Sequence, residues 1–432
     1  MKALVYDVNV EDLIHLMQQA REDKKAYLGE HSLIRLREVP DPKVPFPDWL
    51  LIETRLCGIC GSDTKQIFLD FEQVDSPLAS LASFPQVMGH EVVGTVHEFG
   101  PDVHGLQPGQ RVVLNPWLSC APRGIEPICT ACREGQFSLC RSFREGRLSA
   151  GLHTGTCRDA SGGYAPYLPA HESMAIPVPD PISDDEAVLA DPFSVSLHSV
   201  LRHPPEPGDK VVVYGCGTLG LCAIEILRRL FDAEIYAITR FAHQAQIARR
   251  LGAVETVPWR PVEDIVERLA AVTGSEVYAP IENTGGIPML YGPPGIRVVY
   301  NTVGTAESFA VSVRIAGPRS TVVISGVDAP ARFEWSPHYF KEVNLVGSNA
   351  FGFEEWQGRR QHAIRHYFDL IRERRIDVTP IITHRFRLED YRTAFGFTHA
   401  QGISGAVKVL FDFSEDAPLQ TAAIGAESGS IA

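Results

Sequence analysis

A cysteine, a histidine and two carboxylates near the start of the chain have the residue types and setting of a metal site. Cys60 lies in a glycine-rich run that ends at Asp63, and thirty residues after Cys60 the triplet Gly89-His90-Glu91 contributes an imidazole and a carboxylate. Zinc, a borderline-soft cation, prefers thiolate, imidazole and carboxylate ligands. These residues therefore predict a zinc site.

A second cluster consists of cysteines alone. The spacing C-x8-C-x2-C-x7-C joins Cys120, Cys129, Cys132 and Cys140. The chain has nine cysteines in all, and an odd total fits a disulfide framework poorly. The alternative is a set of reduced, buried thiols, but the clustering favours a second metal site in a reducing cytoplasm.

A glycine fingerprint follows an apolar strand later in the chain. Val211–Tyr214 precede Gly215-Cys216-Gly217-Thr218-Leu219-Gly220, where an apolar helix begins. The first glycine permits a tight turn, the second lets the backbone approach a pyrophosphate, and the third lets the helix pack closely on the strand. Free N–H groups and the positive end of the helix dipole then face the phosphates. The segment predicts a dinucleotide site.

The end of the next strand indicates which dinucleotide is bound. A carboxylate is expected there for the adenosine ribose hydroxyls, but the chain has Thr239 followed by Arg240. A carboxylate would repel a 2′-phosphate, whereas a hydroxyl with a guanidinium would hold one. NADP(H) is therefore favoured. The alternative is that Arg240 is a solvated loop residue and that NAD(H) binds as well.

Two sequence patterns divide the chain into regions that would position these residues. Up to residue 181, short β-branched runs rich in Gly and Pro predict an irregular all-β domain. From 182 to 346, apolar strands alternate with helical patterns, which predicts a doubly wound parallel sheet. The expected strands are 211–214, 234–238, 297–300 and 321–324, and the expected helices are 219–230 and 244–251.

Outside these regions the pattern is less regular. A mostly polar helix is expected at 10–25, as an insertion, and another helix at 359–374. Residues 403–413 are expected to form a strand, so that 347–413 returns to the first domain. The small, polar segment 414–432 is predicted to be a disordered tail.

Bulk composition limits the class of protein. The 432 residues, 44% of them hydrophobic, suffice for two domains with their own cores. A net charge of −13 argues against nucleic acid or an anionic membrane as the main partner. No run approaches about eighteen consecutive apolar residues, and the chain does not begin with a basic region and an apolar stretch. We therefore expect a cytoplasmic protein without a membrane span.

Taken in their order, these motifs resemble the zinc-containing medium-chain alcohol dehydrogenase superfamily, closest to its polyol and threonine dehydrogenase-like branch. The resemblance extends from Met1-Lys2-Ala3-Leu4-Val5 to Ala406-Val407-Lys408-Val409. It implies an α/β protein with a GroES-like irregular β catalytic domain at 1–181, which includes a structural zinc lobe at about 116–142. A Rossmann-type dinucleotide-binding domain would follow at 182–346. Family members are usually homodimers or homotetramers.

The resemblance assigns roles at the first metal site. Cys60 and His90 match the first two catalytic zinc ligands, and Asp63 and Glu91 match the carboxylates behind them. Asp63 would accept the second N–H of His90 and raise its basicity. Where the polyol branch places a Glu-Pro pair, this chain has Asp191-Pro192. Asp191 would bind zinc directly or through water, Glu91 would take the vacant position, or Asp191 would only form a turn.

The resemblance also implies a proton path. Ser62 lies where the family places the hydroxyl that contacts the substrate oxygen, and Lys65 replaces a histidine further along this path. Lys65 would either move protons with a lowered pKa, or be a surface charge beside a relay of water molecules.

The four clustered cysteines, Cys120, Cys129, Cys132 and Cys140, match the closed structural zinc site of the family. Its usual C-x2-C opening is lengthened here to C-x8-C. Closing a longer flexible loop costs little entropy, so metal is still expected. If Cys120 were out of reach, the lobe would hold three thiolates and bind weakly.

The remaining implied contacts involve the coenzyme. Stretches that line the nicotinamide and ribose in the family correspond here to residues that include Val303, Gly326, Val327 and Asn349. Lys408 lies where relatives often place a cation near the pyrophosphate. Structural roles are expected for the other cysteines and for several histidines: Cys57, Cys157, Cys216, Cys222, His97, His153, His171 and His198.

Together, these features predict a zinc-dependent oxidoreductase with two zinc ions per chain. It would transfer a hydride between NAD(P) and a secondary alcohol or polyol, or the corresponding carbonyl. The long segment 67–84 and the insertion at 10–25 point to a larger or polar polyol, sugar or cyclitol-like substrate. The alternatives are a zinc-independent quinone or enoyl reductase, and a non-catalytic, zinc-stabilised nucleotide-binding protein.

Overall fold

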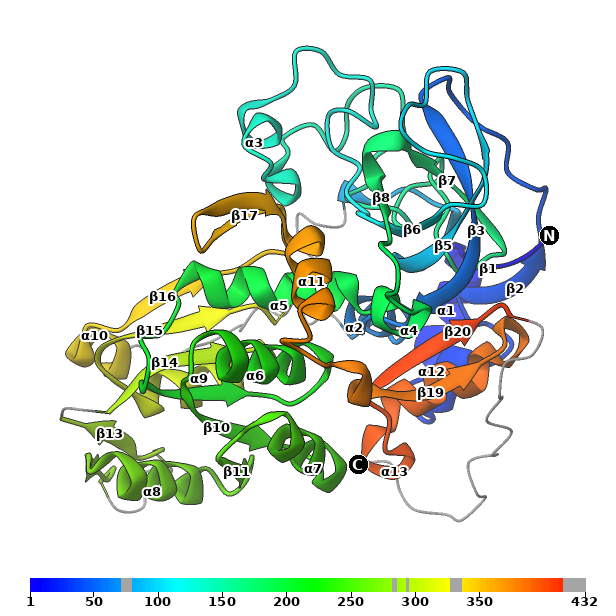
Figure 1. The fold of residues 1–432 in the computed structure, drawn as a ribbon. Helices are drawn as coiled ribbons and strands as arrows, with labels where there is room; N and C mark the ends of the chain where they lie inside the picture. Colours follow the sequence, from blue (N-terminus) through cyan, green and yellow to red (C-terminus); the bar gives the residue numbers. More distant parts are fainter. Residues whose placement is uncertain (71–79, 282–285, 293–294, 327–335, 415–432) are drawn as a thin grey trace.

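The computed structural model describes residues 1–70, 80–281, 286–292, 295–326 and 336–414. One half, built mainly from β-sheet with several short helices, contains the chain start, and a half built from a parallel sheet and helices contains the middle of the chain (Figure 1). The predicted α/β class with a doubly wound sheet and an irregular β portion is confirmed. Val327 and the predicted tail from residue 415 onward lie outside the described residues.

A seven-stranded sheet is the frame of the first half. Its path runs β19-β20-β3-β5-β6-β8, and β7 pairs with β3. Most apolar residues of β3 and β5 pack in one core, whereas Leu56 and Val93 pack in the core that includes part of the parallel sheet. The strands are β3 Trp49–Gly58, β5 Glu91–Phe99, β6 Arg111–Leu114, β7 Tyr167–His171, β8 Ala175–Pro177, β19 Ile382–Phe386 and β20 Lys408–Asp412.

A small sheet and several short helices complete this half. The order of the small sheet is β2-β1-β4. Its strands are β1 Lys2–Tyr6, β2 Ile34–Glu38 and β4 Gln86–Val87. The α-helices are α1 Val10–Gln19, α2 Gly61–Ile67, α3 Thr130–Arg133, α4 Asp184–Val188, α12 Tyr391–His399 and α13 Gln401–Ser404. The 3-10 helices are η1 Lys24–Leu28, η3 Phe137–Leu139, η4 Glu172–Met174, η5 Thr379–Ile381 and η6 Leu388–Asp390.

The second half contains a six-stranded, all-parallel sheet in the order β11-β10-β9-β14-β15-β16. This order reverses direction between β9 and β14, and such a switch point is where doubly wound folds bind ligands. The strands are β9 Lys210–Tyr214, β10 Glu234–Thr239, β11 Glu255–Pro258, β14 Ile296–Asn301, β15 Ala316–Ile324 and β16 Asn344–Gly347. The predicted strands of this half are all present.

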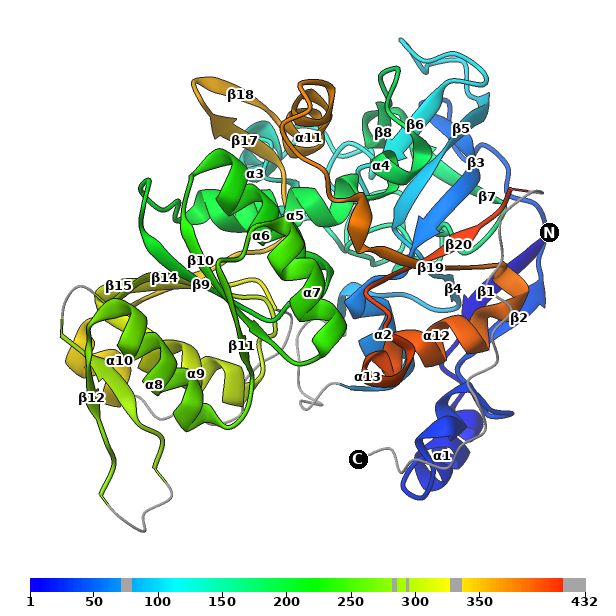
Figure 2. The same cartoon turned by 60° about the horizontal axis from the view of Figure 1, so that its bottom comes forward.

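Helices cover both faces of the parallel sheet (Figure 2). Val211 and Val213 of β9 pack in one core with α6 and α7, whereas Val212 and Tyr214 pack in another with α8 and α9. This alternation explains why the strand is an uninterrupted apolar run. The helices are α5 Ala190–Arg202, α6 Thr218–Leu230, α7 Ala242–Leu251, α8 Val262–Thr273, α9 Ala306–Ile315 and α10 Ser336–Lys341. A hairpin of β12 Glu276–Tyr278 and β13 Met289–Tyr291 lies beside them.

The helix predicted at 359–374 is shorter than expected. Its first residues form strand β18 Arg359–His362, which pairs antiparallel with β17 Phe353–Trp356, and helix α11 spans only Ala363–Arg372. Gln357 and Gly358 join the two strands with φ values of 50° and 72°. Two consecutive positive φ values are the geometry of a type I′ turn, which favours a hairpin over a helix.

The strand predicted at 403–413 begins later, at Lys408. Residues 401–404 form α13, and Gly405 ends that helix with a φ of 71°. A glycine in this left-handed conformation commonly ends a helix. β20 then pairs antiparallel with β3, so the late part of the chain adds a strand next to the one that leads to Cys60.

The β17–β18 hairpin contacts the cysteine-rich lobe at residues 116–142, which the figures show beside it (Figure 1). Ser138 Oγ donates to Asn349 O over 2.9 Å, and the Phe353 N–H donates to Gly135 O over 2.9 Å. The Phe137 ring lies 6.0 Å from the ring of His362. A Cβ on Gly135 would lie 2.5 Å from Phe353, so this close contact requires glycine. The hairpin therefore joins the lobe to the part of the chain that follows the parallel sheet.

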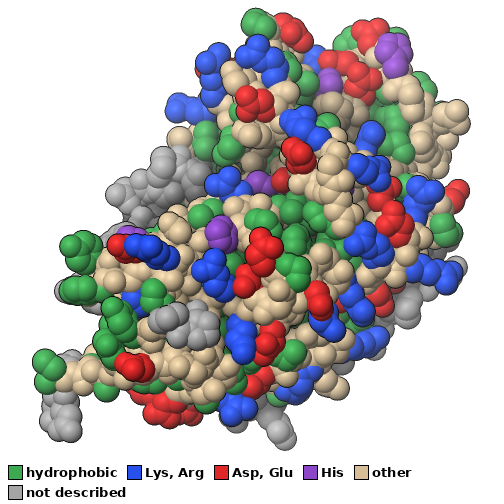
Figure 3. Space-filling view, turned by 60° about the vertical axis from the view of Figure 1, so that its left-hand side comes forward, with side chains coloured by type: hydrophobic (Ala, Val, Ile, Leu, Met, Phe, Trp, Pro, Cys, Tyr) green, Lys and Arg blue, Asp and Glu red, His purple; other side chains and the backbone are tan. Residues whose placement is uncertain are grey.

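Two surface properties bear on the partners of the protein. Acidic and basic side chains are intermingled over the side of the molecule that faces left in Figure 1 (Figure 3). None of the described helices is long and apolar enough to cross a membrane.

Candidate active site

The pairing of β3 with β5 brings the first predicted metal ligands together. Gly58 at the end of β3 pairs with Glu91 at the start of β5. Cys60 follows two residues later as the N-cap of α2, and His90 immediately precedes β5. One ligand atom each from Cys60, His90 and Glu91 lie within 4.8 Å of one another. Sulfur, imidazole and carboxylate at this separation suit a zinc ion.

Asp191 is not part of this group. It lies at the second position of α5, buried except for 7% of its surface, and close enough for its charge to interact with His90 and Glu91. Burial, together with Glu91, raises the pKa of Asp191 to about 7. Of the two carboxylates considered from the sequence, Glu91 has the closer position to Cys60 and His90.

The glycine at position 58 makes room for Glu91. A Cβ on Gly58 would lie 2.0 Å from Glu91 Oε2. That oxygen also accepts a hydrogen bond from Lys408 Nζ, which donates in addition to Ile59 O over 3.1 Å. Glu91 and Lys408 are 2% and 1% exposed, so each charge depends on the other for compensation. The cation assigned from the sequence to the pyrophosphate is therefore held against the metal-site carboxylate.

Asp63 has a partner that the sequence did not reveal. Its Oδ2 accepts hydrogen bonds from the Cys60 N–H over 3.1 Å and from the Tyr164 hydroxyl over 2.7 Å. Its Oδ1 lies 3.6 Å from His90 Nδ1, an ionic approach slightly long for a hydrogen bond. Burial raises the pKa of Asp63. Tyr164 lies 101 residues away in the chain, and no motif marked it.

The surroundings of His90 favour positive charge. Burial alone would lower the pKa of His90, but Asp63 and Cys60 raise it well above the usual value. An imidazole that takes up a proton so readily lies among groups that would equally stabilise a metal cation. This charge balance, with the donor set of Cys60, His90 and Glu91, fits zinc.

A second histidine lies against His90. The ring centroids of His153 and His90 are 4.6 Å apart, and His153 also meets the Trp117 ring edge-on at 5.9 Å. Burial, followed by the charge of His90, lowers the pKa of His153 to about 3, so this imidazole is neutral. The sequence predicted only a structural role for His153, because the residue belongs to no recognised motif.

The proton-path residues share one short helix. Ser62 is the second residue of α2 and Lys65 the fifth, and both are partly buried. The structure thus places Ser62 two residues from Cys60, on the helix that Cys60 caps.

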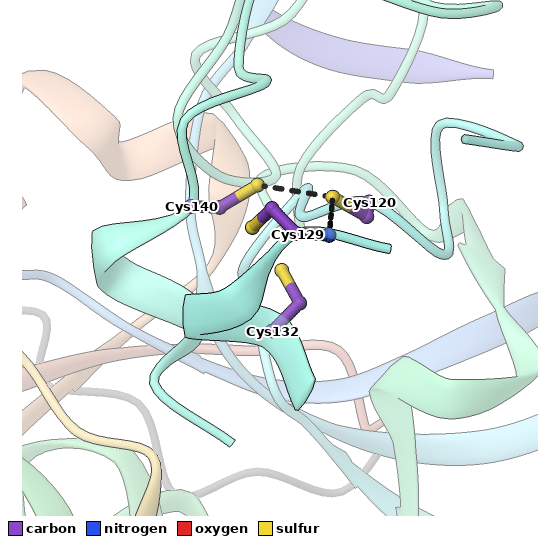
Figure 4. Close-up of side chains that lie close together, drawn as sticks. All are labelled: Cys120, Cys129, Cys132 and Cys140. Carbon is purple, nitrogen blue, oxygen red and sulfur yellow. Dashed lines mark hydrogen bonds between the residues drawn. The ribbon is translucent and has the colours of Figure 1, made fainter. Parts of the chain in front are cut away.

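The four lobe cysteines come together (Figure 4). Their sulfur atoms lie within 4.8 Å of one another, and all four side chains are buried. Cys120 Sγ is 3.6 Å from Cys140 Sγ and accepts a hydrogen bond from the Cys129 N–H over 3.4 Å. The neighbouring Cys140 thiol lowers the pKa of Cys132. The cluster has the composition and closure of a structural zinc site, and the alternative with Cys120 out of reach does not apply.

Arg123 explains how the lengthened C-x8-C loop keeps Cys120 in place. Its side chain is 0% exposed and lies inside the loop. The guanidinium donates to five backbone carbonyls, over 2.8–3.1 Å: those of Leu118, Glu145, Leu148, Ser149 and Gly151. The residues inserted between the cysteines thus supply a centre around which the chain folds. Sequence reasoning missed this residue.

The glycine fingerprint has the geometry expected of a phosphate-binding turn. Gly215 has a φ of 93°, and a Cβ on Gly220 would lie 1.8 Å from Gly215 O. Gly217 caps α6, and a Cβ there would meet nothing within 4 Å. No side chain caps this helix, whose first two residues are Thr218 and Leu219. Its first N–H groups are therefore available to an anion.

The strand ends beside this turn carry the other predicted coenzyme contacts. A Cβ on Gly215 would lie 2.4 Å from Val303, and one on Gly326 would lie 2.3 Å from the carbonyl carbon of Val303. These residues thus lie together at the ends of β9, β14 and β15, at the switch point. Asn349, in contrast, contacts Ser138 of the lobe.

Thr239 and Arg240 lie at the end of β10. Thr239 is buried, and Arg240 is exposed with its guanidinium carbon 4.9 Å from the Trp259 ring centroid and 5.2 Å from that of Phe241. No carboxylate of a described residue pairs with Arg240. The exposed guanidinium thus packs against two aromatic rings and forms no ion pair with the described residues.

The other cysteines and histidines have contacts of their own. Cys57, Cys157, Cys216 and Cys222 are buried in apolar cores. His171 Nε2 lies 3.2 Å from Asp48, His198 Nδ1 lies 2.8 Å from Glu354, and the His97 ring lies 4.9 Å from that of Tyr167.

Comparison with known proteins identifies the family of this chain. A model of the alcohol dehydrogenase GroES-like domain matches residues 46–180, and a model of the zinc-binding dehydrogenase domain matches residues 218–363. The chain belongs to the zinc-containing medium-chain alcohol dehydrogenase superfamily. Both groups of candidate metal ligands lie within the first matched region, and the fingerprint helix α6 lies in the second.

Individual members of the superfamily support the assignment. (R,R)-butanediol dehydrogenase of Saccharomyces cerevisiae is 28% identical over 383 residues, which covers 84% of this chain and 91% of that protein. The crystal structure of 2R,3R-butanediol dehydrogenase from Bacillus subtilis has a TM-score of 0.67 and 25% identity, over 88% of this chain and 96% of that chain. A zinc-binding dehydrogenase from Sinorhizobium meliloti, solved with NADP, has a TM-score of 0.65 and 26% identity, over 88% and 95%.

Proposed function

We propose that this protein is a zinc-dependent oxidoreductase that transfers a hydride between NAD(P) and a secondary alcohol or polyol, or the corresponding carbonyl. The observation that carries the proposal is the approach of Cys60, His90 and Glu91 to within 4.8 Å of one another. Family membership and the similarity to butanediol dehydrogenases support the same reaction class.

The residues of the first cluster are proposed to hold the catalytic metal. Cys60, His90 and Glu91 would be the ligands, and the carboxylate of Asp191 would stand close by. Zinc supplies a Lewis acid when bound, and the nicotinamide supplies the hydride acceptor or donor. Asp63 and Tyr164 orient Cys60 and His90 from behind. Lys408 offsets the charge of Glu91.

Proton transfer is proposed to begin at Ser62. Its Oγ would accept the proton of the substrate hydroxyl, since the residue lies on the helix that Cys60 caps. Lys65 lies three positions further along the same helix, and we propose that the path from Ser62 to solvent passes it.

The glycine turn is proposed to hold the coenzyme. The N–H groups of α6 behind Gly217 would bind the pyrophosphate, with Val303 and Gly326 beside the nicotinamide end. Thr239 and Arg240 would bind the adenosine ribose and its 2′-phosphate, which favours NADP(H) over NAD(H). This preference is supported by the Arg240 guanidinium, which forms no ion pair with a described residue, and by the NADP-bound relative.

Replacement of Arg240 by alanine is expected to weaken NADPH binding by about 1.5–3 kcal/mol, because a charged hydrogen bond to the 2′-phosphate is lost. NADH lacks that phosphate, so its dissociation constant should change far less. Fluorescence titration of both reduced coenzymes measures the difference. The control is Arg260→Ala, because Arg260 also lies over the Trp259 ring but pairs with Glu307. Equal weakening of both coenzymes would contradict the assignment.

The proposed reaction is tested by a screen of secondary alcohols, diols and polyols with NADP and with NAD, in which the reduced nicotinamide is followed by absorbance. Metal analysis accompanies the screen. Turnover together with about two zinc ions per chain supports the proposal. Turnover of quinones or enoyl substrates without metal at Cys60 would instead indicate a zinc-independent reductase. Nucleotide binding without turnover of any of these substrates would indicate a non-catalytic binding protein.

We further propose that the enzyme assembles as a homodimer or homotetramer and works in the cytoplasm. The usual oligomeric state of family members supports the homodimer or homotetramer, and light scattering on the purified protein tests it. None of the nine cysteines forms a disulfide, which supports a reducing compartment.

A further inference from the structure

His153 is an imidazole without an assigned role that stands beside the proposed catalytic metal ligand His90. The two ring centroids are 4.6 Å apart with an angle of 51° between the planes. A group this close to a metal ligand is within reach of a substrate that occupies the metal site. His153 is therefore a candidate for contact with a substrate at that site, although it lies 63 residues from His90 in the chain.

The hydrogen bonds of His153 determine which nitrogen is available. Nδ1 lies 2.7 Å from Thr154 O. A carbonyl oxygen can only accept, so Nδ1 carries the proton, and in the neutral ring Nε2 is left with a lone pair. Nε2 has no hydrogen-bond partner among the described residues. Its lone pair is therefore available to a hydrogen-bond donor of a ligand.

The backbone holds this acceptor in one position. The His153 N–H donates to Thr156 Oγ1 over 3.1 Å, and the His153 carbonyl accepts from the same hydroxyl over 2.7 Å. An isolated β-bridge joins His153 to Trp117, whose ring supports the imidazole edge-on. A hydrogen-bonding group fixed in this way loses little freedom when it binds a ligand, and so it can discriminate between substrates.

We propose that His153 Nε2 accepts a hydrogen bond from a second substrate hydroxyl, on a carbon close to the reacting one, and so selects diols and polyols over monohydric alcohols. This inference rests on the proposed function, since it requires the reacting hydroxyl to lie at Cys60, His90 and Glu91. The imidazole acts as acceptor only, so the group it selects must be a donor. A hydroxyl satisfies this requirement, whereas a methyl group or an ether oxygen does not.

The test compares 2,3-butanediol with 2-butanol, which differ by one hydroxyl. His153→Phe keeps a ring against His90 and Trp117 but removes the acceptor. We expect the ratio of kcat/KM for the diol to that for 2-butanol to fall by about 10-fold, the effect of leaving one hydroxyl without a partner. His153→Gln, whose amide reaches the position of Nε2, should restore part of the ratio.

The control is His97→Phe, because His97 is exposed on β5 and, among the described residues, its ring contacts only the ring of Tyr167. Its ratio should equal that of the unchanged protein. Metal content and coenzyme affinity are measured for each variant, so that a misfolded protein is recognised. An unchanged ratio in His153→Phe, or an equal loss for both substrates, overturns the proposal.

A direct binding measurement separates this proposal from the proposed function. Calorimetry measures the affinity of 2,3-butanediol for the zinc-loaded enzyme without any turnover. Weaker binding to His153→Phe than to the unchanged protein supports the role of His153, even if no substrate is turned over. No binding of the diol to the unchanged protein, or equal binding to both proteins, overturns it. Failure of the proposed function appears separately, as absence of turnover in the unchanged protein.

Discussion

Cys60→Ser is expected to lower kcat by on the order of 10³-fold or more, because Lewis-acid stabilisation by the metal is worth several kcal/mol. Serine lacks the thiolate that a borderline-soft cation prefers, and Cys60 supplies the sulfur ligand of the three-residue group. The coenzyme should still bind, since the glycine turn lies on a different sheet. The measurements are steady-state kinetics, coenzyme titration and metal analysis, which should show one zinc ion per chain in place of two.

Cys57→Ala is the matched control for this variant. Cys57 lies three residues earlier, is 0% exposed, and packs in the core of the first half with its sulfur 3.8 Å from Gly58 O. It is not part of the ligand group, so both zinc ions and turnover should remain. Turnover retained in Cys60→Ser would exclude Cys60 as a metal ligand. Loss of coenzyme binding in the same variant would show that the substitution had damaged the fold.

Arg123→Met is expected to destabilise the lobe by about 4 kcal/mol or more, which is at the upper end for a single substitution. Methionine fills a similar volume but cannot donate hydrogen bonds. Five buried carbonyls would lose their donor at once, and each orphaned acceptor carries a desolvation cost. Release of the guanidinium from its buried position offsets part of this loss, since burial also lowers the pKa of Arg123.

Native-state hydrogen exchange over residues 118–151 measures the effect, because it reports the local opening free energy of this segment separately from global unfolding. Arg144→Met is the control, since Arg144 lies in the same segment with an exposed side chain, and it should change the opening free energy by less than about 0.5 kcal/mol. Metal analysis of Arg123→Met should show partial loss of the zinc ion bound by the four cysteines. Exchange rates equal to those of the unchanged protein would rule out a central role for Arg123.

The parts of the fold that repeat a local pattern were predictable from sequence. The apolar run at Val211–Tyr214 and the glycines after it predict a strand, a turn and a helix, and all three are present. The cysteine cluster was also predictable, because its four members lie close together in the sequence. The hairpin at 353–362 was missed because the helical periodicity of α11 was extended over a segment whose turn, Gln357-Gly358, favours paired strands.

The parts of the site that depend on long-range contacts were not predictable. Lys408 and Glu91 are separated by 317 residues, and only the addition of β20 to β3 brings them together. Tyr164 and His153 belong to irregular segments without periodicity. Their positions beside Asp63 and His90 follow from how the chain folds around the metal site, not from any property of their own neighbourhoods in sequence. Arg123 likewise shows its role only once the five carbonyls converge on it.

The contacts between the cysteine-rich lobe and the β17–β18 hairpin limit how the two halves of the molecule can move. The lobe is inserted in the half that carries Cys60, yet it is bonded to the chain that leaves the parallel sheet, through Gly135 and Ser138. A sliding displacement of one half past the other would break these bonds. A rotation about an axis through the lobe would keep them, so any opening for exchange of coenzyme would swing widest at the end of the molecule opposite the four cysteines.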